Sequence, residues 1–354
     1  MRGTMNITIE KVKESRISQL PLDNIPFGKY FSDHMLVANF DGKEWKEAKI
    51  IPFQPLLMSP AMSALHYGQS IFEGIKAFRG KDKRPYIFRP EMNHKRFNHS
   101  AFRMEMPSIP EELFLGGMRQ LVAIDQQWIP DKENHALYIR PFMFATDDTL
   151  GVHPSEHYQF IIILCPVGPF FAAPMRLYVE ERFTRAAPGG VGFAKAAGNY
   201  GAAMQPTALA KKKGYDQVLW TDAFEHKYIQ EAGTMNVFFI IGNKVITPDL
   251  QSEVILSGVT RESAITLLKE MGLTVEERPI TIDEVIAAYR NGQLLEVFGT
   301  GTAATIAMVR ELNYKGTSMQ FDTSGWKICT EVKRRLDAIH SGEEADVHNW
   351  MYSV

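Results

Sequence analysis

Proline and glycine are concentrated in one stretch, Cys165-Pro-Val-Gly-Pro-Phe-Phe-Ala-Ala-Pro174, which separates two strand-like apolar runs. The chain has 354 residues, more than one hydrophobic core usually organises, so two domains are expected. The stretch is the best candidate for their connection. We therefore predict a smaller α/β domain over 1–165, a linker over 166–174 and a larger domain over 175–354.

Strand-like and helical patterns alternate on both sides of this linker, which predicts an α+β fold. Prolines suit the first turn of a helix, and a Thr281/Glu284 pair has the spacing of a capping box. Gly242-Asn243 is a favourable hairpin turn. The expected strands are Met35–Phe40, Tyr86–Phe88, Ala136–Phe144, Tyr158–Leu164, Met175–Glu181, Gln217–Thr221, Asn236–Ile241 and Lys244–Thr247, and the expected helices start near Pro90 and Pro110 or span Arg261–Met271, Ile282–Asn291 and Trp326–Ile339.

Composition and charge exclude several classes of protein. The net charge of -2 gives no broad positive field for nucleic acid or an anionic membrane. Cys165 and Cys329 are far apart and lack a CxxC partner, so neither a disulfide framework nor a metal site is predicted. The first ten residues have no apolar signal-peptide core, and the longest apolar run, Phe160–Cys165, is far shorter than the roughly 20 residues of a membrane span. We expect a cytoplasmic protein; whether Met1–Thr4, which precede a second methionine, are native stays open.

Two segments carry residues suited to covalent chemistry. Phe193-Ala-Lys195-Ala-Ala-Gly-Asn-Tyr200-Gly places a lysine among small side chains, and partial burial can free a lysine amine to form a Schiff base. In Tyr228-Ile-Gln-Glu231-Ala-Gly-Thr-Met-Asn236 a glutamate interrupts an apolar run, where a carboxylate needs a partner. Taken singly, a surface lysine and an edge-strand charge are the commoner explanations.

Two further segments are suited to binding an anion. Leu256-Ser-Gly258-Val259-Thr260-Arg opens a helix, and Val297-Phe-Gly-Thr-Gly301-Thr302-Ala303 follows a strand. Unpaired N–H groups at helix starts and glycine-rich turns bind phosphate, and Arg96 could add a charge-assisted contact. Each segment alone is weak, because a glycine in a turn usually serves only the turn.

Together these segments, in this order, resemble the fold-type IV pyridoxal-phosphate enzymes, specifically branched-chain aminotransferases of the larger eukaryotic-like type. The similarity covers nearly all of the chain. It implies a two-domain α+β architecture with pyridoxal 5'-phosphate bound in the interdomain cleft, the larger domain binding the cofactor. The most specific segments are Leu65-His-Tyr-Gly-Gln-Ser-Ile-Phe-Glu-Gly-Ile-Lys-Ala-Phe78, the lysine segment, Glu231–Asn236 and Glu296–Thr302.

The resemblance assigns the cofactor residues one by one. Lys195 would be the catalytic lysine that forms the Schiff base, Tyr200 would hydrogen-bond the phenolic oxygen, and Glu231 would pair with the pyridine nitrogen. The phosphate would be held by Arg96, the backbone of Val259 and Thr260, and Thr302. Gly258 belongs to the same phosphate turn, Leu256 would pack on the ring, and Thr234 would line its substrate side.

The same resemblance implies an apolar pocket for leucine, isoleucine or valine. Tyr138 and Arg140 match residues associated with carboxylate recognition, and backbone amides at Gly301 and Ala303 could contribute. Phe170 stands where a tyrosine is common, and Ala304 and Ala307 replace a CxxC found in some relatives, so no thiol switch is expected there. A homodimer is implied in which a turn containing Val152 reaches the partner's site. The substrate residues are Phe31, Tyr67, Phe72, Tyr138, Arg140, Val152, Phe170, Thr234, Gly301 and Ala303.

The expected reaction is transamination of these amino acids with 2-oxoglutarate. D-Amino-acid aminotransferase and aminodeoxychorismate lyase share the fold and the Lys/Glu pair, so fold alone does not choose. The aromatic pocket and the chain length favour the branched-chain enzyme. From another class, a phosphate-ligand binding protein without catalysis is disfavoured by the joint presence of Lys195, Tyr200 and Glu231.

Overall fold

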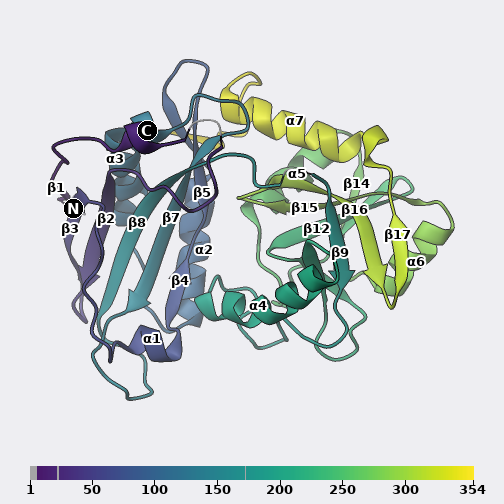
Figure 1. Ribbon diagram of the computed structural model, residues 1–354, viewed down its shortest axis with the longest axis horizontal. Coiled ribbons are helices and arrows are strands. Elements are labelled where there is room, and N and C mark those ends of the chain that lie inside the picture. Colours follow the sequence, from purple (N-terminus) through teal and green to yellow (C-terminus); the bar gives the residue numbers. More distant parts are fainter. Residues whose placement is uncertain (1–5, 22–23, 172) are drawn as a thin grey trace. The chain divides into compact units, whose positions relative to one another are not determined.

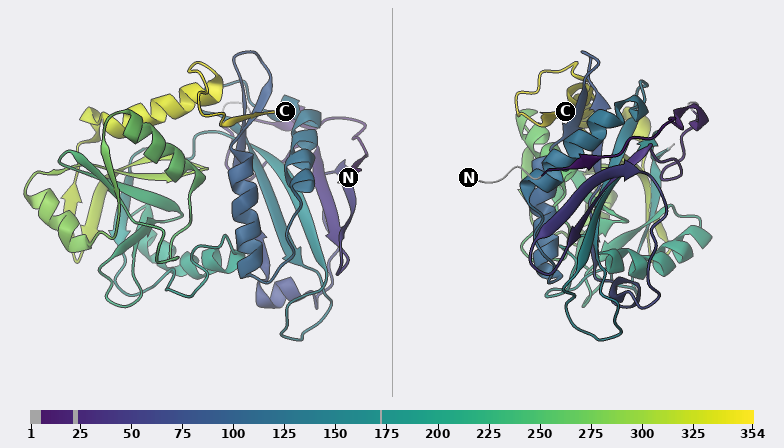
Figure 2. Two further views of the ribbon diagram at one scale, coloured as in Figure 1. Left: turned by 180° about the vertical axis from the view of Figure 1, so that it is seen from behind. Right: turned by 90° about the vertical axis from the view of Figure 1, so that its left-hand side faces the viewer.

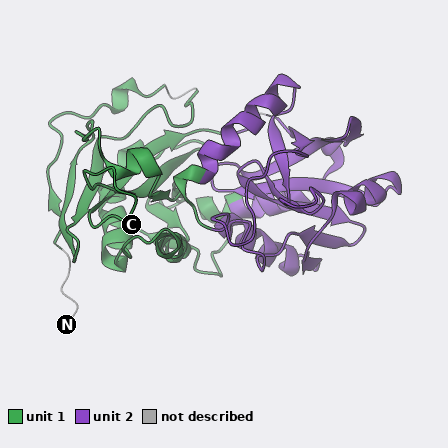
Figure 3. Cartoon of the chain, turned by 90° about the horizontal axis from the view of Figure 1, so that it is seen from below, with its two compact units in different colours: residues 1–170, 194–198, 337–354 green, residues 171–193, 199–336 purple. Residues whose placement is uncertain are grey.

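The computed structural model describes residues 6–21, 24–171 and 173–354 (Figure 1). Met1–Thr4 lie outside these residues. The chain divides into two compact units, coloured separately in Figure 3. The first comprises Met1–Phe170, Ala194–Gly198 and Asp337–Val354, and the second comprises Phe171–Phe193 and Asn199–Leu336.

The change of unit at Phe170 falls inside the predicted linker, but the units differ from a contiguous division at two places. Ala194–Gly198 belongs to the first unit because Ala196 forms an isolated antiparallel bridge with Ile71. Asp337–Val354 belongs there because the last strand, β18 (Met351–Ser353), pairs antiparallel with β6 (Pro85–Phe88). The predicted domain 175–354 therefore loses two segments through long-range backbone pairing, which local sequence patterns do not reveal.

The first unit is built on one large sheet with helices on one face (Figure 2). Its strand order is β1-β3-β2-β8-β7-β5-β6-β18, and β4 also pairs with β7. Phe97 of α2, Leu121 of α3 and Phe114 of the turn before α3 are buried against the sheet's Ile75 and Phe160 in one core. The elements are β1 (Thr8–Ile9), β2 (His34–Phe40), β3 (Trp45–Pro52), α1 (Ser63–Tyr67), β4 (Ser70–Phe72), β5 (Ile75–Arg79), β6, α2 (Pro90–Arg103), α3 (Gly117–Ile124), β7 (Ala136–Ala145), β8 (Tyr158–Val167) and β18.

The second unit contains a closed ring of strands. Its order is β11-β10-β9-β16-β15-β12, and β12 pairs again with β11, so no edge is left in the ring. Strands β13 and β14 continue from β12, and β17 pairs with β16. The elements are β9 (Met175–Val179), α4 (Ala197–Lys212), β10 (Gln217–Thr221), β11 (Ile229–Ala232), β12 (Met235–Ile241), β13 (Lys244–Thr247), α5 (Val259–Glu270), β14 (Thr274–Glu277), α6 (Ile282–Arg290), β15 (Leu294–Gly301), β16 (Thr305–Tyr314), β17 (Thr317–Gln320) and α7 (Ile328–Ser341). The start of α4 and the end of α7 belong to segments of the first unit.

The α+β prediction and most of the expected elements are confirmed. The Thr281 hydroxyl caps α6 by accepting from the Glu284 backbone N–H at 3.1 Å. Gly242, with a φ of 58°, forms the predicted hairpin turn between β12 and β13. The helix expected from Pro110 differs, because it opens with a π-helical turn over Glu112–Gly116 before α3 begins.

Both cysteines are buried free thiols. Burial raises the pKa of Cys165 and of Cys329, and the neighbouring Glu296 carboxylate adds to the effect at Cys329. Both therefore belong to the protein core. In the described part of the chain, no helix has the length and apolar character needed to cross a membrane.

The start of α7 depends on a buried side chain from β15. Glu296 Oε1 accepts hydrogen bonds from the backbone N–H groups of Lys327 and Ile328 at 2.7 and 3.0 Å. Its Oε2 accepts from the Cys329 N–H at 2.8 Å. A carboxylate at this position satisfies the free donors of the first turn and complements the helix dipole. This contact explains why the helix begins at Ile328 rather than at the expected Trp326.

Replacing Glu296 by alanine should destabilise the protein by roughly 2–3 kcal/mol, because three N–H groups at the start of α7, one of them buried, lose a charged acceptor. Urea unfolding monitored by circular dichroism measures the difference. Glu331→Ala, which removes a partly exposed carboxylate of the same helix, is the matched control and should change stability by less than about 1 kcal/mol. Equal losses in the two variants would contradict a special role for Glu296.

Candidate active site

The backbone of Lys195 is held on both sides within the first unit. Its N–H donates to Ser100 Oγ on α2 at 2.9 Å, and its carbonyl accepts from the Phe72 N–H on β4 at 3.1 Å. The side chain is half-buried, and its Nζ lies 5.0 Å from the centre of the Phe72 ring. The amine thus lies near an aromatic face, and this cation–π contact replaces part of its contact with water.

Tyr138 and Arg140 stand on the same side of β7, beside Phe72. Arg140 Nη2 donates to the Tyr138 hydroxyl at 3.0 Å, and the guanidinium lies 4.6 Å from the Phe72 ring centre. The buried Nε of Arg140 has no hydrogen-bond partner among the described residues. Gly74 makes room for this pair, because a Cβ there would lie 2.0 Å from the Tyr138 hydroxyl. The first unit therefore brings a lysine amine, aromatic rings and an arginine with an unused donor to one wall.

The other predicted substrate residues of the first unit surround this wall or lie on a loop. Phe31 stacks on Phe53 and packs against the small cluster that contains Tyr138. Phe170 is linked to Tyr138 through Phe27, which meets each of their rings edge-on at about 5 Å. The Tyr67 hydroxyl donates to the carbonyl of Leu150, two residues before the exposed Val152. Tyr67 thus holds the loop that contains Leu150 and Val152, which the family resemblance predicts to reach the partner subunit's site.

Arg96 lies on α2 and is buried against the carboxylate of Glu73, a residue of the Leu65–Phe78 motif. Glu73 Oε1 accepts from Arg96 Nε and Glu73 Oε2 from Arg96 Nη2, both at 2.7 Å. Burial opposes ionisation of Glu73, but the charge and hydrogen bonds of Arg96, with the charge of Lys195, hold its pKa below the usual range. Glu73 is therefore ionised at neutral pH, and the two cations share a buried counter-charge.

In the second unit Glu231 is buried in a polar frame. Its Oε1 accepts from the Leu256 N–H at 2.9 Å, and its Oε2 forms an ion pair with Arg185 Nε at 3.3 Å. Asn236 completes the frame, because its Nδ2 donates both to the Leu256 carbonyl at 2.9 Å and, more weakly, to Glu231 Oε1 at 3.4 Å. A charge in this setting is fixed in position, and one of its oxygens is only partly occupied.

A row of three buried polar side chains crosses neighbouring strands of the second unit. Glu231 on β11 pairs with Asn236 on β12, which pairs with Thr300 on β15. Directly paired residues point to the same face. The Thr300 Oγ1 atom is buried without a hydrogen-bond partner among the described residues. This face therefore presents more polar groups than the protein itself satisfies.

The first turn of α5 lies against the same row. Its capping residue is Gly258, which has no side chain to cap the helix, and Val259 and Thr260 are buried in the first turn. A Cβ on Gly258 would lie 2.1 Å from Asn236 Oδ1, so only glycine lets this turn approach Asn236. The start of a helix capped in this way presents backbone N–H groups to an anion.

The remaining predicted residues of the second unit lie on turns and on α4. Thr234 is exposed in the two-residue turn between β11 and β12. Gly301 ends β15, and Thr302 and Ala303 form the turn into β16. Tyr200, half-buried, lies in the first turns of α4. The structure thus joins Glu231 to Leu256 by a hydrogen bond and brings Gly258, which Val259 and Thr260 follow, close to Asn236 of the same row. The turn residues lie at the ends of the strands of this unit.

Sequence reasoning missed four residues that these contacts bring in: Glu73, Arg185, Phe27 and Thr300. Glu73 lies in the Leu65–Phe78 motif and Thr300 in the Glu296–Thr302 motif, but the sequence does not show that their side chains are buried. Arg185 could have been suspected from the need of Glu231 for a partner, but its position 46 residues away in sequence gave no local signal.

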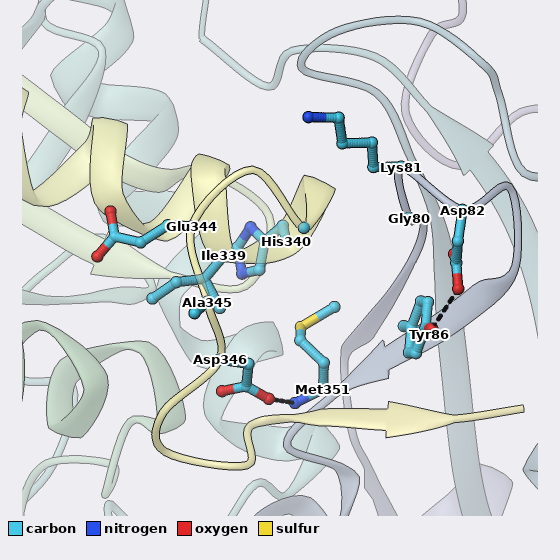
Figure 4. A pocket seen from close by; sticks show the side chains of 11 residues that line it. Gly80, Lys81, Asp82, Tyr86, Ile339, His340, Glu344, Ala345, Asp346 and Met351 are labelled. Atoms are coloured by element: carbon cyan, nitrogen blue, oxygen red, sulfur yellow. Dashed lines mark hydrogen bonds between the residues drawn. The ribbon is translucent and has the colours of Figure 1, made fainter.

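Two cavities lie outside these groups. One of about 380 Å³ in the first unit is lined by His340, Asp82, Tyr86 and Asp346 among others (Figure 4). Two of its carboxylates are used internally: Asp346 accepts from the Met351 N–H at 2.8 Å, and Asp82 accepts from the Tyr86 hydroxyl at 2.7 Å. A second cavity of about 740 Å³ lies in the second unit. Neither contains a predicted site residue, and no metal-binding cluster is found in the described ranges.

Comparisons with known proteins place the chain in a family. The model of the family "Amino-transferase class IV" matches residues 70–312. Branched-chain-amino-acid transaminase 1 of Bacillus subtilis is 45% identical over 99% of this chain and 100% of its own length. The branched-chain-amino-acid aminotransferase of Mycolicibacterium smegmatis is 39% identical over 98% of this chain and 95% of its own.

Solved structures give the same result. The branched-chain aminotransferase of Escherichia coli matches with a TM-score of 0.75 and 26% identity over 91% of this chain and 99% of that one. Another solved branched-chain amino acid aminotransferase, complexed with N-(5'-phosphopyridoxyl)-L-glutamate, matches with a TM-score of 0.72 and 26% identity over 90% of this chain and 98% of that one. The placement in the larger, eukaryotic-like subgroup is not tested by these matches and stays a prediction.

Proposed function

The chain belongs to the class IV aminotransferases, and from this premise we propose that it transfers the amino group of leucine, isoleucine or valine to 2-oxoglutarate with pyridoxal 5'-phosphate as cofactor. The relatives named as branched-chain aminotransferases, alike over nearly the full length, support this substrate class over D-amino acids or aminodeoxychorismate. The structural neighbour complexed with a phosphopyridoxyl derivative supports the cofactor.

The residues present fit this cofactor in both units. The glycine-capped start of α5 and Arg96 suit a phosphate, and the framed carboxylate of Glu231 suits a ring nitrogen that must stay protonated. The unpartnered Thr300 hydroxyl leaves a polar group that a ligand can satisfy. We infer that Arg96, Gly258, Val259, Thr260 and Thr302 hold the phosphate, Leu256 and Thr234 flank the ring, and Tyr200 donates to its phenolic oxygen.

When bound, pyridoxal phosphate supplies an electron sink for the substrate's Cα. Lys195 would hold the cofactor covalently until the substrate's amine displaces it, and the freed lysine amine would then carry the proton to and from that Cα. Glu231 would keep a proton on the ring nitrogen, and its ion pair with Arg185 helps to fix the carboxylate in position. The aromatic side chains around Lys195 exclude water from the reacting atoms.

The wall of Phe72, Tyr138 and Arg140 beside Lys195 is the observation that carries this function. Its rings can bury an aliphatic side chain, while the Tyr138 hydroxyl and the unused Arg140 Nε can meet a carboxylate. One pocket can therefore accept leucine in one half-reaction and glutamate in the other. Phe31, Tyr67, Val152 and Phe170 extend the apolar part, and the backbone of Gly301 and Ala303 adds donors.

Lys195→Ala should lower kcat for leucine by several orders of magnitude, since no other group is assigned to bond the cofactor and carry the proton. Transfer of the amino group to 2-oxoglutarate is measured as glutamate formed. Lys211→Ala removes an exposed lysine of α4 and should keep wild-type activity. Activity of the Lys195 variant within tenfold of wild type would rule out the proposed role.

Tyr138→Phe should reduce kcat/KM for glutamate more than for leucine, because it removes a hydroxyl that only the carboxylate-bearing side chain uses. The ratio of the two values should shift roughly two- to tenfold, the effect of one hydrogen bond. Tyr86→Phe removes a hydroxyl bound to Asp82 elsewhere in the same unit and should leave the ratio unchanged. An equal loss for both substrates would mean that Tyr138 contributes shape alone.

We further propose that the enzyme works as a homodimer. Leu150 and Val152 are 62% and 84% exposed on the loop that Tyr67 holds, and Leu57 and Leu65 are also exposed in this unit. Apolar side chains exposed on a loop bound to a predicted substrate residue favour coverage by a second copy.

Val152→Asp should shift the protein toward monomer in light scattering and lower kcat together with the dimer fraction, because a charge would be buried in the interface. Phe224→Asp, at a similarly exposed apolar position of the second unit, is the control and should stay dimeric. A monomeric wild-type protein with full activity at assay concentration would refute the shared site.

A further inference from the structure

Glu73 is a carboxylate with no exposed surface, placed between β4 and β5. Two of its bonds form a fork to Arg96, from Nε and Nη2, each 2.7 Å long. Its Oε2 also accepts from Asn93 Nδ2 at 2.8 Å and from the Gly74 N–H at 3.2 Å. The carboxylate is therefore fully engaged, and it is fixed both by the backbone of the next residue and by two side chains of α2.

The fork restricts how Arg96 can bind anything else. A guanidinium has a side edge, Nε with one Nη, and an end formed by its two Nη atoms. Glu73 takes the side edge, so an anion must be met by the end of the group. Asn93 and Arg96 are three residues apart on α2 and so lie on one helix face, which lets the same carboxylate hold both. The orientation of Arg96 is thus set before any ligand arrives.

The fork also balances charge. Arg96 is only 9% exposed, and a buried guanidinium without a counter-charge is strongly unfavourable. Lys195 is a second positive charge that interacts electrostatically with the Glu73 carboxylate. Removing the carboxylate's charge would leave Arg96 free to rotate toward other acceptors and would leave two cations in the site without a common anion.

We propose that Glu73 is a positioning residue for cofactor binding: it holds Arg96 end-on, so that the guanidinium meets the phosphate of pyridoxal phosphate in a preset orientation. The inference rests on the proposed function, which gives Arg96 the phosphate as its ligand. Glu73 touches neither cofactor nor substrate in this role and acts only through Arg96.

The test is Glu73→Gln in the full-length chain, freed of cofactor by dialysis. Glutamine fills the same space but has one acceptor oxygen, so the fork is broken. Pyridoxal phosphate and pyridoxal, which lacks the phosphate, are each titrated and their dissociation constants measured from protein fluorescence. We expect the constant for pyridoxal phosphate to rise roughly ten- to hundredfold, as for loss of a charge-assisted bond, and that for pyridoxal to change less than about twofold.

Two further variants complete the design. Glu91→Gln makes the same change at an exposed position of α2 and should alter neither constant. Arg96→Gln should weaken pyridoxal phosphate selectively, and the double variant Glu73→Gln with Arg96→Gln should be no weaker than Arg96→Gln alone, because Glu73 acts through Arg96.

The outcomes separate the two ideas. If Arg96→Gln weakens both ligands equally, the phosphate assignment in the proposed function fails. If Arg96→Gln is selective but Glu73→Gln leaves pyridoxal phosphate binding unchanged, or weakens both ligands alike, the positioning role is overturned. If circular dichroism shows that Glu73→Gln does not fold, Asn93→Leu is used instead, because it removes one of the carboxylate's hydrogen bonds. Its dissociation constant for pyridoxal phosphate should rise by a smaller factor, again with little change for pyridoxal. An equal change for both ligands would also overturn the positioning role.

Discussion

The hydrogen bonds on both sides of Lys195 are the constraint on which the candidate active site depends. Ser100 Oγ accepts from its N–H, and its carbonyl accepts from the Phe72 N–H. The five-residue segment Ala194–Gly198 is thereby made part of the first unit, although its neighbours in sequence belong to the second. A long, flexible side chain such as lysine can serve as a nucleophile only if its starting point is fixed, and here the backbone provides that fixed point.

Each unit also buries a glutamate that belongs to the candidate site, and the two are stabilised in different ways. Glu73 is paired with Arg96 by two short hydrogen bonds, so most of its charge is neutralised by one partner. Glu231 has a longer ion pair with Arg185 and a backbone donor at Leu256. A forked pair fixes the orientation of its cation, whereas a looser frame keeps a carboxylate able to accept one more proton donor. These contacts match a positioning role for the first and a ring-nitrogen partner for the second.

The sequence predicted those features whose causes are local. The Thr281 cap, the Gly242-Asn243 hairpin and the start of α2 at Pro90 each depend on a few adjacent residues, and all are found. The candidate residues Phe72, Tyr138, Arg140 and Lys195 came from a family resemblance, and the structure brings them into contact. Arg185 and the return of residues 337–354 to the first unit could not be predicted, because both rest on pairing between segments far apart in the chain.

The glycines of the motifs show why residue type alone gave an incomplete account. Gly74 and Gly258 could be taken as turn residues, yet neither has a positive φ. A side chain at Gly74 would collide with the Tyr138 hydroxyl, and one at Gly258 would collide with Asn236 Oδ1. Both glycines are therefore required by a polar side chain that approaches the backbone, and in each case that side chain belongs to the candidate site. Close approach to a functional group, rather than backbone freedom, is the physical reason for glycine at these two positions.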